Sequence, residues 1–112
     1  MKENLNAYYA VIFSSKHSEN TAGYADMAQK MELLAKQQKG YLGIESARNS
    51  NSAAPNAGLG ITISYWESLD AIKNWKNQTD HLFAQQKGKS DWYSWYKVRI
   101  CKIEREYEFY KP

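Results

Sequence analysis

The sequence predicts an α+β fold in which an antiparallel sheet carries helices on one face. Four stretches either alternate apolar with other residues at a period of two or are rich in β-branched and aromatic residues, as strands are. Between them, segments with apolar residues at every third or fourth position are typical of amphipathic helices. The order is strand, helix, strand, strand, helices and strand. This order is that of a ferredoxin-like βαββαβ unit.

The first strand and the first helix follow a polar tail over residues 1–6, which we expect to be loose. The strand is predicted over Ala7–Phe13, where both faces are apolar, which indicates that both are covered. A polar loop is predicted over Ser14–Asn20. It contains His17, which we expect to be solvated. The helix then runs to about Gln38, because its apolar residues form one stripe.

A hairpin is predicted in the middle of the chain. Its strands are Tyr41–Arg48, with Leu42 and Ile44 on the inner face, and Leu59–Trp66. The segment between them, Asn49–Gly58, is rich in Asn, Ser, Pro and Gly, which favour turns. We therefore expect two paired strands joined by a long tip.

Two helices are predicted after the hairpin. Ser68 offers a hydroxyl that caps the first of them. A break is predicted near Asn77–Gln78, because several polar residues in a row weaken a helix. The second helix carries His81, and Gly88 supplies its C-terminal stop.

A closing strand is predicted over about Tyr96–Tyr107. Its apolar residues change phase near Cys101, which indicates a bulge or a strand that enters a second environment. It is also longer than a usual strand. Both features suit a strand that ends against a second copy of the chain, so we expect a homodimer formed through the sheet and this C-terminal strand. Arg99 lies inside the strand, where an arginine either pairs with a carboxylate across the sheet or binds an anionic ligand. We expect the ion pair with a carboxylate.

Composition excludes several classes of function. The 112 residues suit a single domain, with a core over about residues 8–107. The net charge of +3 comes from 15 basic and 12 acidic residues that are mixed along the chain, without the concentrated basic footprint of a nucleic-acid-binding protein. The histidines and the single cysteine lack metal-ligand spacing. The lone Cys101 and the absence of a signal peptide or membrane span predict a cytoplasmic protein without a membrane partner.

The run from Gly60 to Tyr107, which begins GITISYWESLDAIKNWKNQTDHLFAQQKG, resembles the antibiotic biosynthesis monooxygenase family. The helix that ends at Gly40 and the strand Tyr41–Ser46 extend the resemblance to roughly residues 8–107. It implies a dimeric α+β barrel, in which two sheets pair across a twofold axis. The family includes cofactor-free oxygenases that act on phenols and quinols, haem-degrading enzymes, and members without an assigned reaction.

The resemblance implies a monooxygenase that needs no cofactor and takes a small hydrophobic aromatic or quinol-type substrate. Its site is expected between the sheet and the helices, with Trp75 and Tyr65 as walls and His81 as the base that removes a phenolic proton. The substrate anion then passes an electron to dioxygen. Each assignment has a structural alternative: His81 hydrogen-bonds to backbone or solvent, and Trp75 fills the seam between sheet and helix.

Trp66 and Trp92 are further candidates for the substrate site. Tyr65 is expected to point inward with Ile61 and Ile63, and Trp66, on the opposite parity, lines the barrel mouth or a dimer seam. Trp92 belongs to an aromatic cluster that forms a box for a planar substrate or a subunit contact. The second use is favoured, because aromatic residues are enriched in interface cores.

The alternative function is a non-catalytic barrel that binds a hydrophobic ligand such as haem. The haem-degrading branch of the family uses an Asn on the first strand, a helix Trp and a His. Trp75 matches the Trp, but Ala7–Phe13 has no Asn, and the His position falls near Gln85 or Gln86 rather than at His81. These departures argue against haem cleavage of that type, though not against porphyrin binding.

Overall fold

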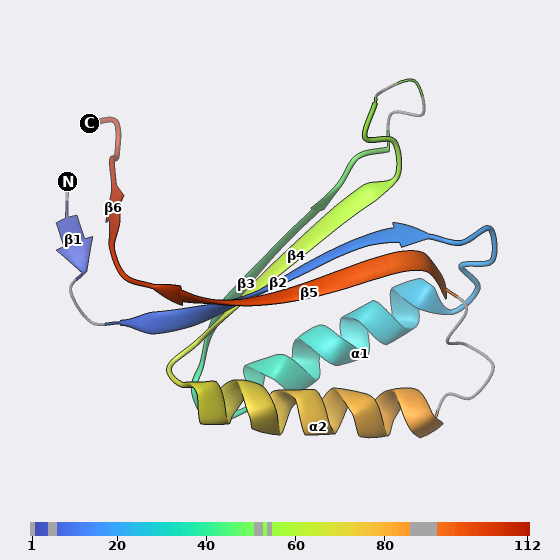
Figure 1. Ribbon diagram of the computed structural model, residues 1–112, viewed down its shortest axis with the longest axis horizontal. Coiled ribbons are helices and arrows are strands. Elements are labelled where there is room, and N and C mark those ends of the chain that lie inside the picture. The colour runs from blue at the N-terminus through green and yellow to red at the C-terminus, as the bar shows by residue number, and fades with distance from the viewer. Residues whose placement is uncertain (1, 5–6, 51–52, 54, 86–91) are drawn as a thin grey trace.

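The computed structural model describes residues 2–4, 7–50, 53, 55–85 and 92–112. In chain order the elements are β1 (Lys2–Asn4), β2 (Tyr8–His17), α1 (Tyr24–Lys36), β3 (Tyr41–Arg48), β4 (Leu59–Trp66), α2 (Leu69–Gln85), β5 (Tyr93–Ile103) and β6 (Glu106–Glu108). The main sheet is antiparallel, in the order β3-β4-β2-β5, and both helices cover one of its faces (Figure 1). The predicted ferredoxin-like α+β fold is thus confirmed. No helix in the described ranges is long and apolar enough to cross a membrane.

The core lies between the main sheet and the helices, around Trp66. This side chain is fully buried, and Ala35 of α1 packs against it together with Ala71 and Ile72 of α2. Alanines at these points let both helices approach the sheet closely. The indole of Trp66 therefore fills the space that the small helix residues leave.

The face of β4 that carries Trp66 is the buried one, contrary to the sequence prediction. Gly60 and Ser64 share this face and are buried. Ile61 is 39% exposed and lies with Tyr65 on the face without helices. The larger apolar residues of the strand therefore point away from the helices, and small residues make room for one tryptophan beneath them.

β2 continues beyond its predicted end, so that Ser14–His17 belong to a strand and not to a loop. Ser14 and Ser15 are buried and pair with residues of β4. β2 lies between β4 and β5, which satisfy its backbone hydrogen-bonding groups on both sides. Polar side chains therefore do not end the strand here.

The β3–β4 hairpin is confirmed, with one local difference. The two strands pair from Tyr41–Trp66 to Arg48–Gly60, and the hairpin extends beyond the rest of the sheet (Figure 1). The register shifts between Tyr41 and Gly43, and Leu42 at this bulge is 49% exposed. The prediction that Leu42 faces inward is wrong for this reason.

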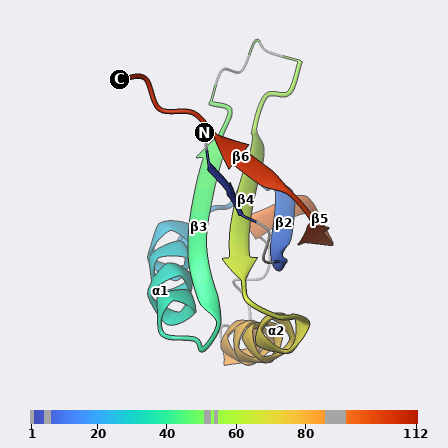
Figure 2. The same cartoon turned by 90° about the vertical axis from the view of Figure 1, so that its left-hand side faces the viewer.

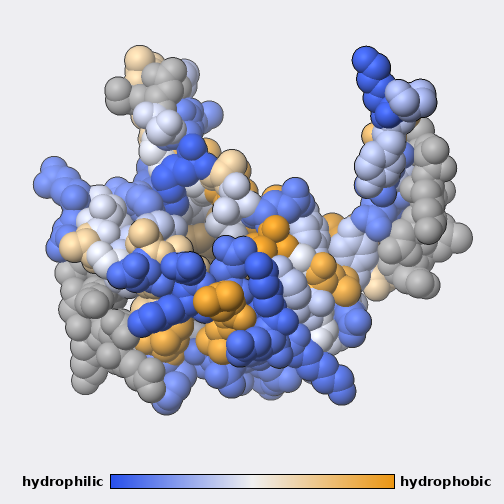
Figure 3. All heavy atoms as spheres, turned by 180° about the vertical axis from the view of Figure 1, so that it is seen from behind, coloured by the Kyte–Doolittle hydropathy of each residue, from blue (hydrophilic) through white to orange (hydrophobic). Residues whose placement is uncertain are grey.

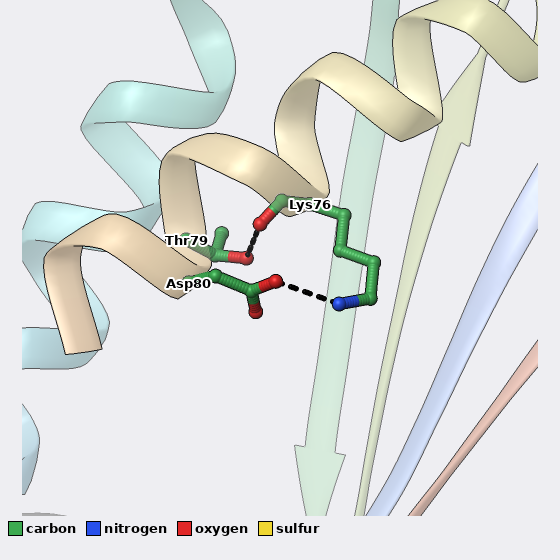
Figure 4. A network of polar contacts seen from close by, with 3 residues as sticks. All are labelled: Lys76, Thr79 and Asp80. Carbon is green, nitrogen blue, oxygen red and sulfur yellow. Dashed lines mark hydrogen bonds and ion pairs between the residues drawn. The ribbon is translucent and has the colours of Figure 1, made fainter. Parts of the chain in front are cut away.

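α2 is one continuous helix, so the predicted break near Asn77–Gln78 is wrong. The hydroxyl of Thr79 donates to the carbonyl oxygen of Lys76 at 2.9 Å, and the Lys76 ammonium pairs with the Asp80 carboxylate at 2.7 Å (Figure 4). These polar groups find partners within the helix, and the exposed residues of the expected break meet water. The helix is therefore not interrupted.

The predicted cap of α2 is confirmed, because Ser68 Oγ accepts the backbone N–H of Ala71 at 3.1 Å. The predicted stop at Gly88 lies outside the described residues. α1 begins at Tyr24, after Gly23 in a left-handed conformation, and ends at Lys36, close to the predicted end at about Gln38.

The two ends of the chain form a separate ribbon from β1 and β6, which stands away from the main sheet (Figures 1 and 2). The expected loose tail is therefore wrong for Lys2–Asn4. The closing strand is divided: β5 ends at Ile103, and β6 follows after Glu104 and Arg105. The bulge predicted near Cys101 is not found, because β5 pairs with β2 in regular register from Val98 to Ile103 and the division comes only after Ile103.

Gly40, at the turn from α1 to β3, provides a test of the packing of α2. It has a φ of +88°, and a Cβ there would lie 2.7 Å from Ala71 Cβ. We expect Gly40→Ala to lower the free energy of unfolding by about 2–4 kcal/mol, from left-handed strain and overpacking together. Chemical denaturation measures it. Gly58→Ala is the control, because Gly58 has a φ of +77° but open space around it; equal losses in both variants would contradict the packing argument.

Candidate active site

Two of the predicted site residues, Trp66 and Trp75, meet in the seam between β4 and α2. Their rings stack with centroids 5.7 Å apart at an angle of 27°. Trp66 Nε1 donates to Ser64 Oγ at 2.9 Å, and Tyr41 packs edge-on against the same indole. The buried Trp66 thus has its one polar atom satisfied inside the core. It does not line an open mouth or a subunit seam, and Trp75 fills part of the same packing.

Tyr65 lies on the other face of the sheet. Its hydroxyl donates to Glu45 Oε1 at 2.8 Å, and this bond, followed by burial, raises the pKa of Tyr65. The ring of Tyr8 lies edge-on at 6.0 Å, and its hydroxyl donates to the Glu106 carboxylate, which raises the pKa of Tyr8 to about 12. Tyr65 is therefore not a wall of a site between the sheet and the helices.

Two residues of β5 occupy the same helix-free face. Arg99 is exposed and forms an ion pair with no carboxylate of the described residues, so the expected pair is absent there. Cys101 is half-buried opposite Ala10 of β2. Neither residue approaches the helices.

The predicted base, His81, is exposed on α2 one residue after Asp80, whose ion pair appears in Figure 4. It follows Trp75 by six positions, which places the two side chains about 120° apart around the helix. The sheet separates His81 from Tyr65. The structure therefore does not gather the three predicted residues around one cavity.

A different group of aromatic side chains surrounds His17, where β2 ends and α1 and β5 begin, at the right of Figure 1. The centroid of the His17 ring lies 4.2 Å from that of Tyr24 and 5.8 Å from that of Tyr93. Trp92 packs edge-on against Tyr24 at 5.9 Å, and its Nε1 donates to the carbonyl oxygen of Ala22 at 2.7 Å. We call His17, Tyr24, Trp92 and Tyr93 the His17 cluster. Of the predicted site residues, only Trp92 belongs to it.

His17 carries an unsatisfied polar atom in this cluster. Its Nε2 is buried and has no hydrogen-bond partner among the described residues. Leaving such an atom unpaired costs about 1–3 kcal/mol. Burial, and then the positive charge of Arg48, lower the pKa of His17 below its ordinary 6.5. The imidazole is therefore neutral at neutral pH, with Nε2 free of a proton donor among the described residues.

The phenol of Tyr93 stays protonated at neutral pH, because burial first, and then a hydrogen bond with Tyr24, raise its pKa. The Arg48 guanidinium supplies a positive field at the neutral imidazole of His17. Within the described ranges, no group of three or more His, Cys, Asp or Glu side chains is placed to hold a metal ion.

The sequence contained a signal for His17 that the prediction of a loop overlooked. Tyr9, Val11 and Phe13 alternate on the helix-facing parity of β2, and Ser15 and His17 continue the same parity. The polar character of the following residues concealed this periodicity.

The lowered pKa of His17 predicts a pH dependence of stability. The folded chain binds this proton less readily than the unfolded chain, so the contribution to stability is complete above pH 6.5 and is lost as the pH falls below it. We expect the denaturation midpoint to fall more steeply between pH 7.5 and pH 5 in the wild type than in His17→Gln, whose side chain does not titrate. Parallel pH profiles would contradict this assignment.

The chain is similar to known proteins both in sequence and in fold. The sequence profile described as antibiotic biosynthesis monooxygenase matches residues 7–87. YqjZ, an uncharacterized protein of Bacillus subtilis, is 50% identical over 99 residues, which are 88% of this chain and 82% of that relative. The crystal structure of PA3566 from Pseudomonas aeruginosa matches with a TM-score of 0.63 at 14% identity, over 93% of this chain and 99% of that one. A variant of SnoaB, a cofactor-independent oxygenase from Streptomyces nogalater, matches with a TM-score of 0.61 at 12% identity, over 86% and 91% of the two chains.

Proposed function

Because the chain belongs to the antibiotic biosynthesis monooxygenase family, we propose that it is a monooxygenase that uses dioxygen without a bound cofactor and acts on a small aromatic or quinol-type substrate. The shared fold with SnoaB, a cofactor-independent oxygenase, supports this class of reaction. The aromatic side chains of the His17 cluster support a planar, hydrophobic substrate.

The observation that carries the proposal is the buried, unpaired Nε2 of the neutral His17 imidazole. A general base must be deprotonated at the working pH and must reach the proton that it removes. The lowered pKa of His17 meets the first condition, and the unpaired Nε2 offers the acceptor for the second. His81 is the second candidate, but its exposed position on α2 gives it no shelter from water.

The reaction requires only substrate, dioxygen and a base. His17 takes the proton of a phenolic hydroxyl that is conjugated with a ring CH carbon, and the resulting enolate, which has carbanion character at that carbon, gives one electron to dioxygen. The resulting radical pair combines into a C–O bond, and the imidazolium returns its proton to the peroxide anion. Loss of water from this hydroperoxide leaves a quinone carbonyl. In total the substrate loses two hydrogens and gains one oxygen atom, and the other oxygen leaves as water.

The surroundings of His17 suit this chemistry, because an apolar site keeps water away from a reactive anion and a radical pair. Nε2 has no accessible surface in the described structure, so a substrate reaches it only when a neighbouring ring moves aside. Tyr24 is the ring closest to the imidazole and belongs to the first turn of α1.

Oxygen uptake tests the proposal. Purified protein, treated with a chelator and freed of flavin, is mixed with anthrone or with a hydroxylated naphthalene in air-saturated buffer. We expect uptake of one dioxygen per carbonyl formed, with incorporation of one labelled oxygen atom from ¹⁸O₂. Uptake no faster than that of buffer alone over the substrate panel, or uptake that requires added flavin, would exclude a cofactor-independent monooxygenase.

We also propose that two copies of the chain associate through the helix-free sheet face and the C-terminal strands. Apolar side chains of the helix-free face and of the C-terminal segment are exposed: Ile61, Trp95, Tyr107, Phe109 and Tyr110. Tyr96, Val98 and Ile100 are exposed on the other side of the edge strand β5. Figure 3, which views the molecule from behind, shows further apolar groups at the surface between hydrophilic ones, on the side opposite β5. Such exposure supports an association surface. Sedimentation over a range of concentrations tests it, and a monomer at every concentration would exclude it.

A further inference from the structure

Arg48 holds a guanidinium against the sheet next to the His17 cluster. Its Nη1 donates to the carbonyl oxygen of Gly58 at 2.7 Å, and its Nη2 donates to Ser15 Oγ at 2.9 Å. The group lies across Gly60, where an added Cβ would come within 2.2 Å of Arg48 Cζ. Gly60 therefore provides the space that lets the guanidinium reach from β3 across β4 to β2.

No carboxylate of the described residues neutralises the positive charge of Arg48. Its hydrogen bonds go to neutral oxygens, including a third at 3.4 Å to the carbonyl oxygen of Ser15. The side chain is half-buried, which makes an unpaired charge costly. A site for an anion explains why the fold retains such a group.

We propose that Arg48 binds an acidic group of the substrate, so that the protein selects aromatic compounds that carry both a carboxylate and a phenolic hydroxyl. The guanidinium holds the carboxylate, and His17 Nε2 meets the hydroxyl. This inference rests on the proposed function, and it names the class of substrate.

The spacing along β2 supports this arrangement. Ser15, which positions the guanidinium, and His17 are two residues apart on one strand, which corresponds to about 7 Å. That span is comparable to the length of a benzene ring with substituents at opposite ends. Phe13 and Tyr93, whose ring centroids lie 5.3 Å apart, stand on the helix-facing side of the same region. They offer ring faces and edges to a planar ligand.

The electrostatics of the site agree with the arrangement. The charge of Arg48 adds to the effect of burial that lowers the pKa of His17, and at Tyr93 it opposes part of the rise in pKa that burial causes. An anion bound at the guanidinium reduces this field and thereby makes His17 a stronger base. Binding of an acidic substrate therefore prepares the imidazole to remove the phenolic proton.

Binding of two matched ligands tests the inference without turnover. Para-hydroxybenzoate and para-hydroxybenzamide have nearly the same shape and differ in charge. Titration calorimetry under nitrogen with the wild type should give about 10- to 100-fold tighter binding of the acid, the range of a charge-assisted hydrogen bond. Equal affinities, or tighter binding of the amide, would overturn the proposal, and this comparison needs no variant.

Two substitutions test whether Arg48 causes the preference for the acid. Arg48→Gln removes the charge, and Gly60→Ala displaces the guanidinium while it leaves the arginine in the chain. Both should abolish the preference for the acid. Gly43→Ala is the control, because an added Cβ there meets only Tyr65 Cδ2 at an ordinary 3.9 Å. A preference that survives in Arg48→Gln would overturn the assignment to Arg48, and circular dichroism verifies that each variant is folded.

The failure of this inference and the failure of the proposed function give different results. Acid-selective binding without any oxygen uptake supports the anion site and overturns the monooxygenase. Oxygen uptake with neutral quinols, together with equal affinity for the acid and the amide, overturns the anion site and supports the monooxygenase.

Discussion

Replacement of His17 by alanine should lower the rate of oxygen uptake by about 10²- to 10⁴-fold, the range for loss of a general base. The reason is that the phenolic proton then has no neutral acceptor inside the site. Single-turnover oxygen uptake at saturating substrate measures the rate. We expect His81→Ala to keep a rate close to that of the wild type, because that side chain is exposed on α2.

Two controls separate the chemistry of His17 from its packing. His17→Gln preserves much of the side-chain volume beside Tyr24 but cannot act as a base near neutral pH. It should bind substrate and still lose the rate. In addition, the acid limb of the pH–rate profile should disappear with the imidazole. A large loss of rate in His81→Ala, together with a wild-type rate in His17→Ala, would instead identify His81 as the base.

Replacement of Trp66 by alanine should lower the free energy of unfolding by about 3–5 kcal/mol, the usual cost of deleting a buried aromatic ring. The indole has no exposed surface and packs between the ring of Trp75 and small residues of both helices. The substitution also leaves Ser64 Oγ without its donor. Urea denaturation followed by circular dichroism measures the loss.

Trp75→Ala and Leu33→Ala test whether the loss of stability depends on how deeply the replaced side chain is buried. Trp75 is only partly buried, so its loss should cost less than that of Trp66, although the same stacked pair is broken. Leu33 is 55% exposed on α1, and its replacement should change stability by no more than about 0.5 kcal/mol. A Trp66→Ala variant as stable as Leu33→Ala would show that the core does not lie where the structure places it.

The sheet topology could be predicted from the sequence because alternation and turn composition are local signals. The strand Tyr41–Arg48 and the strand Leu59–Trp66 have the bounds that were predicted for them. The buried face of the second strand could not be predicted, since it depends on the helices that cover it. Gly60 and Ser64 are inside because Trp66 needs space, which no single-strand pattern reveals.

The candidate site was harder to predict than the fold. Trp75 and His81 stand out in the sequence because they lie on an obvious helix, yet one fills the core and the other faces solvent. His17 lies in a polar stretch that was predicted to be a loop; it continues the helix-facing parity of β2, and its pairing with Tyr93 of β5 shows that it belongs to the strand. Tyr93 and Tyr24 join it from segments about 70 residues apart, a proximity that tertiary folding alone creates.

The pairing of β1 with β6 brings the first and last strands of the chain side by side, with Lys2 opposite Glu108. A short peptide linker would therefore close the chain into a ring without disturbing the main sheet, and new ends opened at the tip of the β3–β4 hairpin would give a circular permutant. An affinity tag attached at either end of the chain would lie next to this ribbon of β1 and β6. Tagged and tag-free protein should accordingly be compared before any self-association is measured.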